Sequence, residues 1–279
     1  MRSIAVVPRG FKPDAGRFAQ VVHAVNVQVN KDFTPAWEIS ASLGYFARIE
    51  DAPHNSSFVI VATDVKGNGG MHFAPGVPDE PPHAIVAYDD AEDWSVLLSH
   101  EVLEMLVDPS CRYMVAGPDP ENSSRKAQFL VEVCDPCMQI TYKNQEAPGI
   151  RVSDFCLPAY YGLKGGGRYT HRNSIDAAFT VARGGYLTWE NASGDWRQLD
   201  ATGGGTSTST IDPKDIAGAV AAGNFRGTLD RRHGNYVGAS FKEQSNGSMA
   251  EQDADERHDL RRRASRMAAL RDALGMLRL

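Results

Sequence analysis

The sequence has little cysteine, no long hydrophobic run and no excess of basic residues. Its 279 residues include 4 cysteines, and 35 acidic residues outnumber 29 Lys+Arg for a net charge of −6. The longest apolar stretches, such as residues 58–62, are far shorter than the roughly 18 to 20 residues of a membrane-spanning helix, so we expect no membrane span. A mildly acidic chain also lacks the basic footprint of a nucleic-acid binder. Few cysteines and an early Pro8 and Arg9, which interrupt any signal-peptide core, favour a cytoplasmic protein without a disulfide scaffold.

Hydrophobic periodicity predicts an α+β fold. Apolar runs at residues 4–7, 58–62 and 82–88 are typical of buried strands, whereas residues 15–29 and 94–107 have helical spacing. Beyond residue 107 the pattern favours short strands, at 129–134, 138–142 and 149–153 and in a terminal hairpin formed by 186–189 and 195–199.

Composition divides the chain into three parts. Residues 1–200 carry the periodic body, and residues 201–250, which begin with a Gly/Ser/Thr-rich stretch, predict a flexible linker. Residues 251–279 predict an amphipathic helix with apolar residues near heptad spacing. Seven arginines against two aspartates give residues 257–279 a charge of +5, leaving −11 for the rest. We expect this helix to dock on its own body or on a second copy; a role as an arm for a partner protein, a membrane surface or nucleic acid is the alternative.

A His-Glu-x-x-Glu motif lies in the apolar helix expected at 94–107. His100 and Glu104 are four residues apart and project from one face of the helix, which is the spacing of two ligands to one metal ion. In peptidases with His-Glu-x-x-His, the Glu after the first ligand takes a proton from metal-bound water, and Glu101 has that place here. Buried carboxylates are costly unless they are paired or bind metal. The alternative is a polar stripe on a half-exposed helix.

A third protein ligand has to come from elsewhere. Asp108 lies about 12 Å along a straight helix from His100, too far to share an ion. Glu132 and Asp135 are better candidates; on a strand they would point to opposite faces, so we expect one of them, preferably Glu132, to coordinate. The other acid, with Asp108, could hold the second ring nitrogen of His100, although Asp108 and Asp135 both precede proline and could simply form turns.

Several other residues could contribute. His72, in an expected Gly-rich loop, could polarise a carbonyl or stabilise an oxyanion, as could Tyr88, Tyr113 or Tyr142. The pair Cys134 and Cys137 has redox spacing but no strand-to-helix context, and free buried thiols or a local disulfide are favoured over a redox or structural zinc site. A carboxylate di-iron site usually needs Glu and His pairs on a four-helix bundle, which a β-rich chain lacks.

Eight segments together resemble a poorly characterised group of bacterial and phage zincin-like proteins. They are residues 26–37, 70–73, the strand expected at 82–88, 99–109, 132–136, 152–158, 184–186 and 196–198, and the resemblance spans roughly residues 1 to 200. It implies a zincin-like fold in which an edge strand, here about residues 83–88, lies beside the active-site helix and pairs with an extended peptide. The expected function is therefore a zinc-dependent metallopeptidase acting on a peptide or protein. A catalytically degenerate, phage-associated binding or structural module is the alternative.

Overall fold

The structure is a computed structural model that describes residues 2–63, 65, 69–75, 81–88, 94–144, 146–201, 205–212 and 214. The chain divides into two units, Met1–Val237 and Gly238–Leu279, and all described residues belong to the first. The amphipathic helix expected at 251–279 and most of the linker expected at 201–250 lie outside the described residues.

A five-stranded sheet with strand order β2-β1-β3-β5-β4 forms the first half of this unit. Strands β1 (Arg2–Arg9), β2 (Ala41–Tyr45), β3 (Ser57–Ala62) and β5 (His83–Ala87) are parallel, and β4 (Gly70–Phe73) is antiparallel to β5. The strands predicted near residues 4–7, 58–62 and 82–88 are confirmed. The edge position predicted for 83–88 is wrong, because the glycine-rich segment before it supplies β4, which takes that position.

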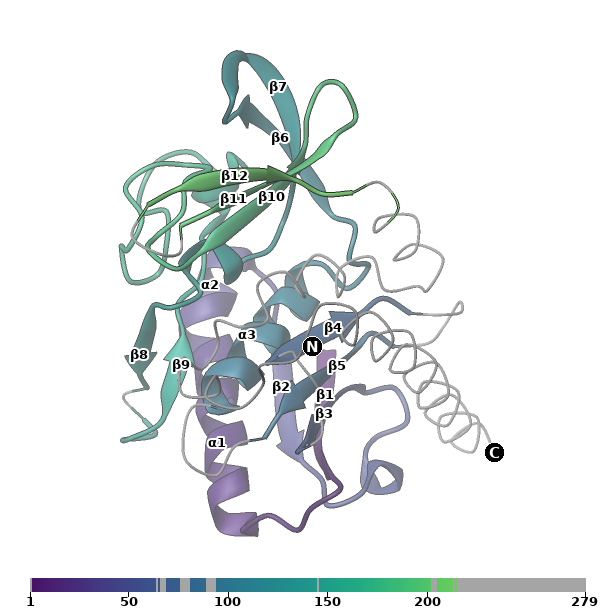
Figure 1. The fold of residues 1–279 in the computed structure, drawn as a ribbon. Coiled ribbons are helices and arrows are strands. Elements are labelled where there is room, and N and C mark those ends of the chain that lie inside the picture. Colours follow the sequence, from purple (N-terminus) through teal and green to yellow (C-terminus); the bar gives the residue numbers. More distant parts are fainter. Residues whose placement is uncertain are drawn as a thin grey trace. The chain divides into compact units, whose positions relative to one another are not determined.

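Two long helices cover one face of this sheet (Figure 1). Helix α1 (Ala15–Gln28) begins where Asp14 Oδ1 accepts a hydrogen bond from the backbone N of Arg17, and it continues through a π-helical turn, η1 (Val29–Phe33), into α2 (Thr34–Trp37). Helix α3 (Trp94–Val107) packs on β5 and β4. The rings of Phe18 and Trp94 join α1 to α3 with centroids 4.8 Å apart, and alternate strand residues such as Val6 and Val59 pack beneath the helices.

A second, antiparallel sheet follows, with order β12-β11-β10-β7-β6. Its strands are β6 (Met114–Asp119), β7 (Asn122–Leu130), β10 (Tyr186–Glu190), β11 (Trp196–Asp200) and β12 (Ser207–Thr210), and β10 and β11 form the predicted hairpin. Strand β12 pairs with β11, and Ile211 after it is 1% exposed. The part of the predicted flexible linker that the structure describes at 207–211 is therefore part of the body, because polar Ser and Thr suit an exposed edge strand.

The chain between β7 and β10 contains a small two-stranded sheet. Strands β8 (Thr141–Lys143) and β9 (Arg151–Ser153) pair antiparallel, and β9 lies against α3. Short 3-10 turns, η2 (Ile49–Asp51), η3 (Asp135–Cys137) and η4 (Pro158–Tyr161), complete the described elements. The architecture is a mixed α+β fold. Within the described residues, no helix combines the length and hydropathy required to cross a bilayer.

Candidate metal centre

Helix α3 brings three ionisable side chains of the His-Glu-x-x-Glu motif into the protein interior. All 14 residues of the helix are buried, with His100 8%, Glu101 5% and Glu104 1% exposed. The helix is covered by the first sheet on one side and contacts β9 on another. The polar-stripe alternative is therefore wrong, and these side chains carry the cost of buried charge.

The Nε2 atom of His100 faces two carboxylates. It lies 3.2 Å from Oε2 of Glu104 and 3.1 Å from Oδ1 of Asp135. Two ligand atoms bound to a tetrahedral zinc at about 2.0–2.1 Å are about 3.3 Å apart. The two distances from Nε2 are therefore close to those between zinc ligands, and the predicted pairing of His100 with Glu104 on one helical face is confirmed as geometry.

The segment after β7 supplies both downstream acids. The strand ends at Leu130, and η3 starts at Asp135, so residues 131–134 are not the strand that the sequence predicts. Because the chain turns here, Glu132 (4% exposed) and Asp135 (1% exposed) both reach the cluster, with ligand atoms within 4.8 Å of each other and of Glu104. The expectation that they point to opposite faces is wrong. Asp135, not the favoured Glu132, is the acid at 3.1 Å from His100.

Backbone contacts hold this turn in place. The backbone N of Cys134 donates to Oε1 of Glu104 at 3.1 Å, and the hydroxyl of Tyr161 donates to the carbonyl oxygen of Glu132 at 2.6 Å. Gly185 packs directly on the turn, because a Cβ at that position would lie 2.2 Å from the carbonyl oxygen of Pro136. This contact explains the glycine at position 185. The sequence shows the glycine but not that it packs against Pro136.

Glu101 lies between His72 and Gly70. Its Oε2 is 3.5 Å from Nδ1 of His72, and a Cβ on Gly70 would lie 2.6 Å from its Oε1. His72 is fully buried and belongs to strand β4, so its predicted place in a loop is wrong. The ring of His72 contacts the carboxylate of Glu101, the predicted base. The predicted role of His72 was a different one, toward a substrate carbonyl or oxyanion.

Asp108 organises the chain after α3 and also holds His72. Its Oδ1 accepts hydrogen bonds from the backbone N and Oγ of Ser110, and its Oδ2 accepts one from the backbone N of Tyr113 at 2.7 Å. Of the two roles that the sequence allowed for its side chain, the structure shows the turn. Its carbonyl oxygen lies 3.2 Å from Nε2 of His72. No residue type signals this contact in a sequence, because the carbonyl oxygen belongs to the backbone.

Burial and neighbouring charge act in opposite directions on His100. Burial alone lowers the pKa of the imidazole, but the carboxylates of Glu104 and Asp135 outweigh burial and raise that pKa well above its usual range. The nearby thiols behave differently, because burial raises the pKa of Cys134, Cys137 and Cys156. All four cysteines are free and buried, so of the two predicted alternatives the structure has free thiols and no local disulfide. Protonated thiols are poor nucleophiles, which argues against a redox pair.

The tyrosines considered as alternatives to His72 make other contacts. The hydroxyl of Tyr142 donates to Oδ2 of Asp32 at 2.7 Å. The ring of Tyr88 stacks on Phe11 with centroids 4.0 Å apart, and Tyr113 is 38% exposed.

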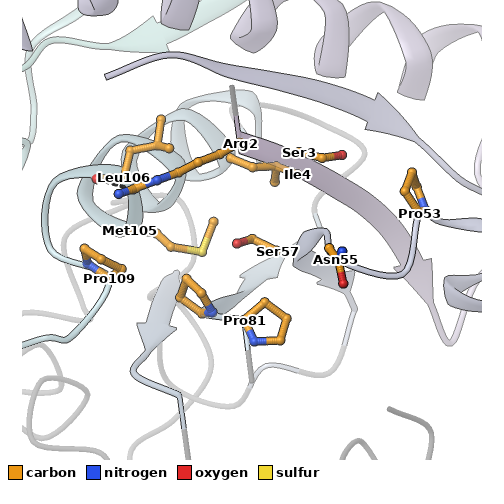
Figure 2. Close-up of a pocket in the computed structure, with 11 residues that line it drawn as sticks. Arg2, Ser3, Ile4, Pro53, Asn55, Ser57, Pro81, Met105, Leu106 and Pro109 are labelled. Carbon is orange, nitrogen blue, oxygen red and sulfur yellow. Dashed lines mark hydrogen bonds between the residues drawn. The ribbon is translucent and has the colours of Figure 1, made fainter. Parts of the chain in front are cut away.

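A cavity of about 470 Å³ lies away from the cluster, where the first residues of β1 and β3 meet the last turn of α3 (Figure 2). Arg2 extends along its wall, and its Nη1 donates to the carbonyl oxygen of Leu106 at 2.8 Å. The cavity is lined by Arg2, Ser3, Ile4, Pro53, Asn55, Ser57, Pro81, Pro82, Met105, Leu106 and Pro109. This set contains no histidine or carboxylate.

Comparisons with protein-family models, with curated proteins and with solved structures found no match to this chain.

Proposed function

We propose that the chain is a zinc-dependent hydrolase of the zincin-like metallopeptidase kind, with His100, Glu104 and Asp135 as the zinc ligands. One observation carries the proposal: two carboxylate oxygens lie 3.1 and 3.2 Å from a single imidazole nitrogen in the protein interior. Imidazole and carboxylate are ordinary zinc ligands, and three protein ligands are the number typical of catalytic zinc sites. Glu132, in the same group, is placed to accept hydrogen bonds around the ligands or to add a fourth oxygen.

The other residues of the cluster have separate roles. A zinc ion in this position supplies an acidic bound water and polarises a carbonyl oxygen. Glu101 accepts a proton at its carboxylate, because it follows the first ligand on α3 and its position is set by Gly70 and His72. The ring of His72, on strand β4, lies beside this carboxylate, with Nδ1 3.5 Å from Oε2 of Glu101. A base held on rigid elements in this way suits general-base catalysis.

A peptide substrate is supported by the neighbouring sheet. Strand β4 ends the order of the described strands in the first sheet, and it packs against α3 beside the cluster. Extended peptides add to sheets at edge strands, so a peptide aligned with β4 would run past Glu101. We propose an extended segment of a peptide or protein as the substrate class.

The test combines metal analysis with peptide cleavage. Protein purified without added metal is expected to contain zinc by inductively coupled plasma mass spectrometry, and His100→Ala and Asp135→Asn are expected to lose it. An exposed carboxylate variant, Glu146→Gln, serves as the matched control. Glu101→Gln should retain zinc and lose cleavage of a broad peptide library. A wild-type protein without metal would overturn the proposal.

A non-catalytic metal-binding module is the second candidate, and the burial of the cluster favours it. The side chains of His100 and Glu101 are 10% and 7% exposed, which leaves narrow access for a substrate. Such a module would hold zinc through the same ligands but cleave no peptide in the library, and Glu101→Gln would then leave its binding and fold unchanged.

A further inference from the structure

The buried cluster contains two overlapping sets of metal ligands. One set is His100 with Glu104 and Asp135, and Glu132 groups with these two acids. The other consists of His72, Glu101 and Glu104, whose ligand atoms all lie within 4.8 Å of one another. Glu104 belongs to both. A carboxylate has two oxygens and can bind two cations at once, as in hydrolases with paired metal ions about 3.5–4 Å apart.

The hydrogen bonding of His72 is that of a metal ligand. Its Nε2 lies 3.2 Å from the carbonyl oxygen of Asp108, and because a carbonyl only accepts, Nε2 carries the proton. Nδ1 lies 3.5 Å from Oε2 of Glu101, a separation that two ligands of one cation can have. Metal-binding histidines typically donate their other N–H to a backbone carbonyl in this way.

The charge of the cluster favours two cations. Its four carboxylates, Glu101, Glu104, Glu132 and Asp135, are at most 5% exposed and carry −4 when ionised. Carboxylate oxygens held close together in the interior attract divalent cations, and two such ions carry the same amount of charge as four ionised carboxylates.

We propose that His72, Glu101 and Glu104 form a second divalent-cation site, joined to the His100 site through Glu104. The inference rests on the proposed function for the first ion and extends it. Four of the six side chains are carboxylates, and carboxylate oxygens bind Mn²⁺ as well as Zn²⁺, so the pair of sites suits either ion. When the second site is filled, Glu101 is a metal ligand and cannot act as the general base. Occupancy of this site therefore regulates the catalytic role proposed for Glu101.

This ligand set does not need the four-helix bundle that the sequence argument associated with paired metals. One helix supplies His100, Glu101 and Glu104, strand β4 supplies His72, and the turn after β7 supplies Glu132 and Asp135. Two histidines and four carboxylates converge from three elements, and tertiary structure brings His72, Glu132 and Asp135 to the three residues of the helix.

The experiment is a Mn²⁺ titration of the full chain, stripped with chelator and dialysed, followed by gel filtration, metal analysis and electron paramagnetic resonance. We expect two Mn²⁺ per wild-type chain and an exchange-coupled spectrum. His72→Ala should bind one Mn²⁺ with the six-line spectrum of an isolated ion, and Glu101→Gln, which conserves shape, should weaken the second ion at least tenfold. The exposed His23→Ala is the matched control and should behave like wild type.

The outcomes separate the two proposals. One Mn²⁺ per wild-type chain that is lost in Asp135→Asn would overturn the second site and leave the first intact. Two ions that persist uncoupled, or that persist in both His72→Ala and Glu101→Gln, would also overturn it. No bound ion in the wild type, by titration and in Zn²⁺-supplemented protein, would overturn both.

Discussion

Gly185 is the residue on which the position of the ligand turn can be tested most directly. In Gly185→Ala the new Cβ would lie 2.2 Å from the carbonyl oxygen of Pro136 and 2.9 Å from that of Asp135. Restoring an ordinary contact of 3.4 Å moves the Pro136 carbonyl by about 1.2 Å. No side-chain rotation relieves this overlap, because the atoms are backbone. The hydrogen bond from the backbone N of Ala182 to the same carbonyl, 2.8 Å long, is strained by the same movement.

Two effects of different size are expected from this displacement. Overpacking of a well-packed site costs about 1–3 kcal/mol of unfolding free energy, and each kcal/mol lowers Tm by about 2–4 °C in a domain of 150–250 residues. Asp135 moves with the turn, so Zn²⁺ affinity should fall by about 10- to 100-fold, the range seen when support of a metal ligand is lost.

The assay uses thermal melts in EDTA for stability and competition with a chromophoric chelator for Zn²⁺ affinity. Gly165→Ala is the matched control, since a Cβ there meets nothing within 4 Å. Asp135→Ala should lose affinity to a similar or greater extent. If Gly185→Ala binds Zn²⁺ within threefold of wild type while Asp135→Ala does not, the turn does not position Asp135 as we argue.

Three further predictions follow from individual contacts. Gly70→Ala places a Cβ 2.6 Å from Oε1 of Glu101 and should displace that carboxylate by about 0.8 Å. Peptide cleavage should fall by about 100-fold while His100 still binds its ion. Unchanged cleavage in an active protein would contradict this prediction. Ser99→Ala removes the Oγ that accepts a hydrogen bond from the buried backbone N of Ser153 at 2.7 Å. The free energy of unfolding, measured in urea, should fall by about 1–3 kcal/mol, and a fall of less than about 0.5 kcal/mol would refute this prediction. Burial raises the pKa of Asp154 above its ordinary 3.8 despite its hydrogen bonds, so the stability that its proton contributes at low pH is lost as pH rises through the raised pKa. Asp154→Asn should therefore flatten that part of the curve of unfolding free energy against pH. An unaltered curve would show that Asp154 does not cause this pH dependence.

The central elements of the fold were predictable because their signals are local. Helix α3 is a continuous apolar segment of helical length, and strands β1, β3 and β5 are short apolar runs bounded by polar residues. The pairing of His100 with Glu104 follows from helix geometry, which needs no tertiary information. These features carry the motif and its setting.

The rest of the site depends on contacts between distant segments. Strand β4 is four residues long and follows glycines, so its sequence is typical of a loop. It is a strand because it pairs with β5. The two downstream acids share a site because the chain leaves β7 at Leu130, and no rule of strand alternation applies beyond that residue. The role of Asp108 toward His72 runs through a carbonyl oxygen, which every residue has.

Glu104 is the residue at which this cluster departs from the His-Glu-x-x-His pattern, and the departure has a physical consequence. A histidine nitrogen offers one lone pair and binds one ion, whereas the two oxygens of a carboxylate can serve two. Glu104→His should therefore convert the cluster to one that holds a single ion at His100, with the second site reduced to His72 and Glu101. We expect one Mn²⁺ per chain with an isolated-ion spectrum, and a fall of at least tenfold in the affinity for a second ion. Glu104→Gln, which conserves shape and retains one carbonyl oxygen, controls for the lost hydrogen bond from the backbone N of Cys134. If Glu104→His still binds a coupled pair of ions, then Glu104 does not bridge them, and the two ligand sets are joined through another acid of the cluster.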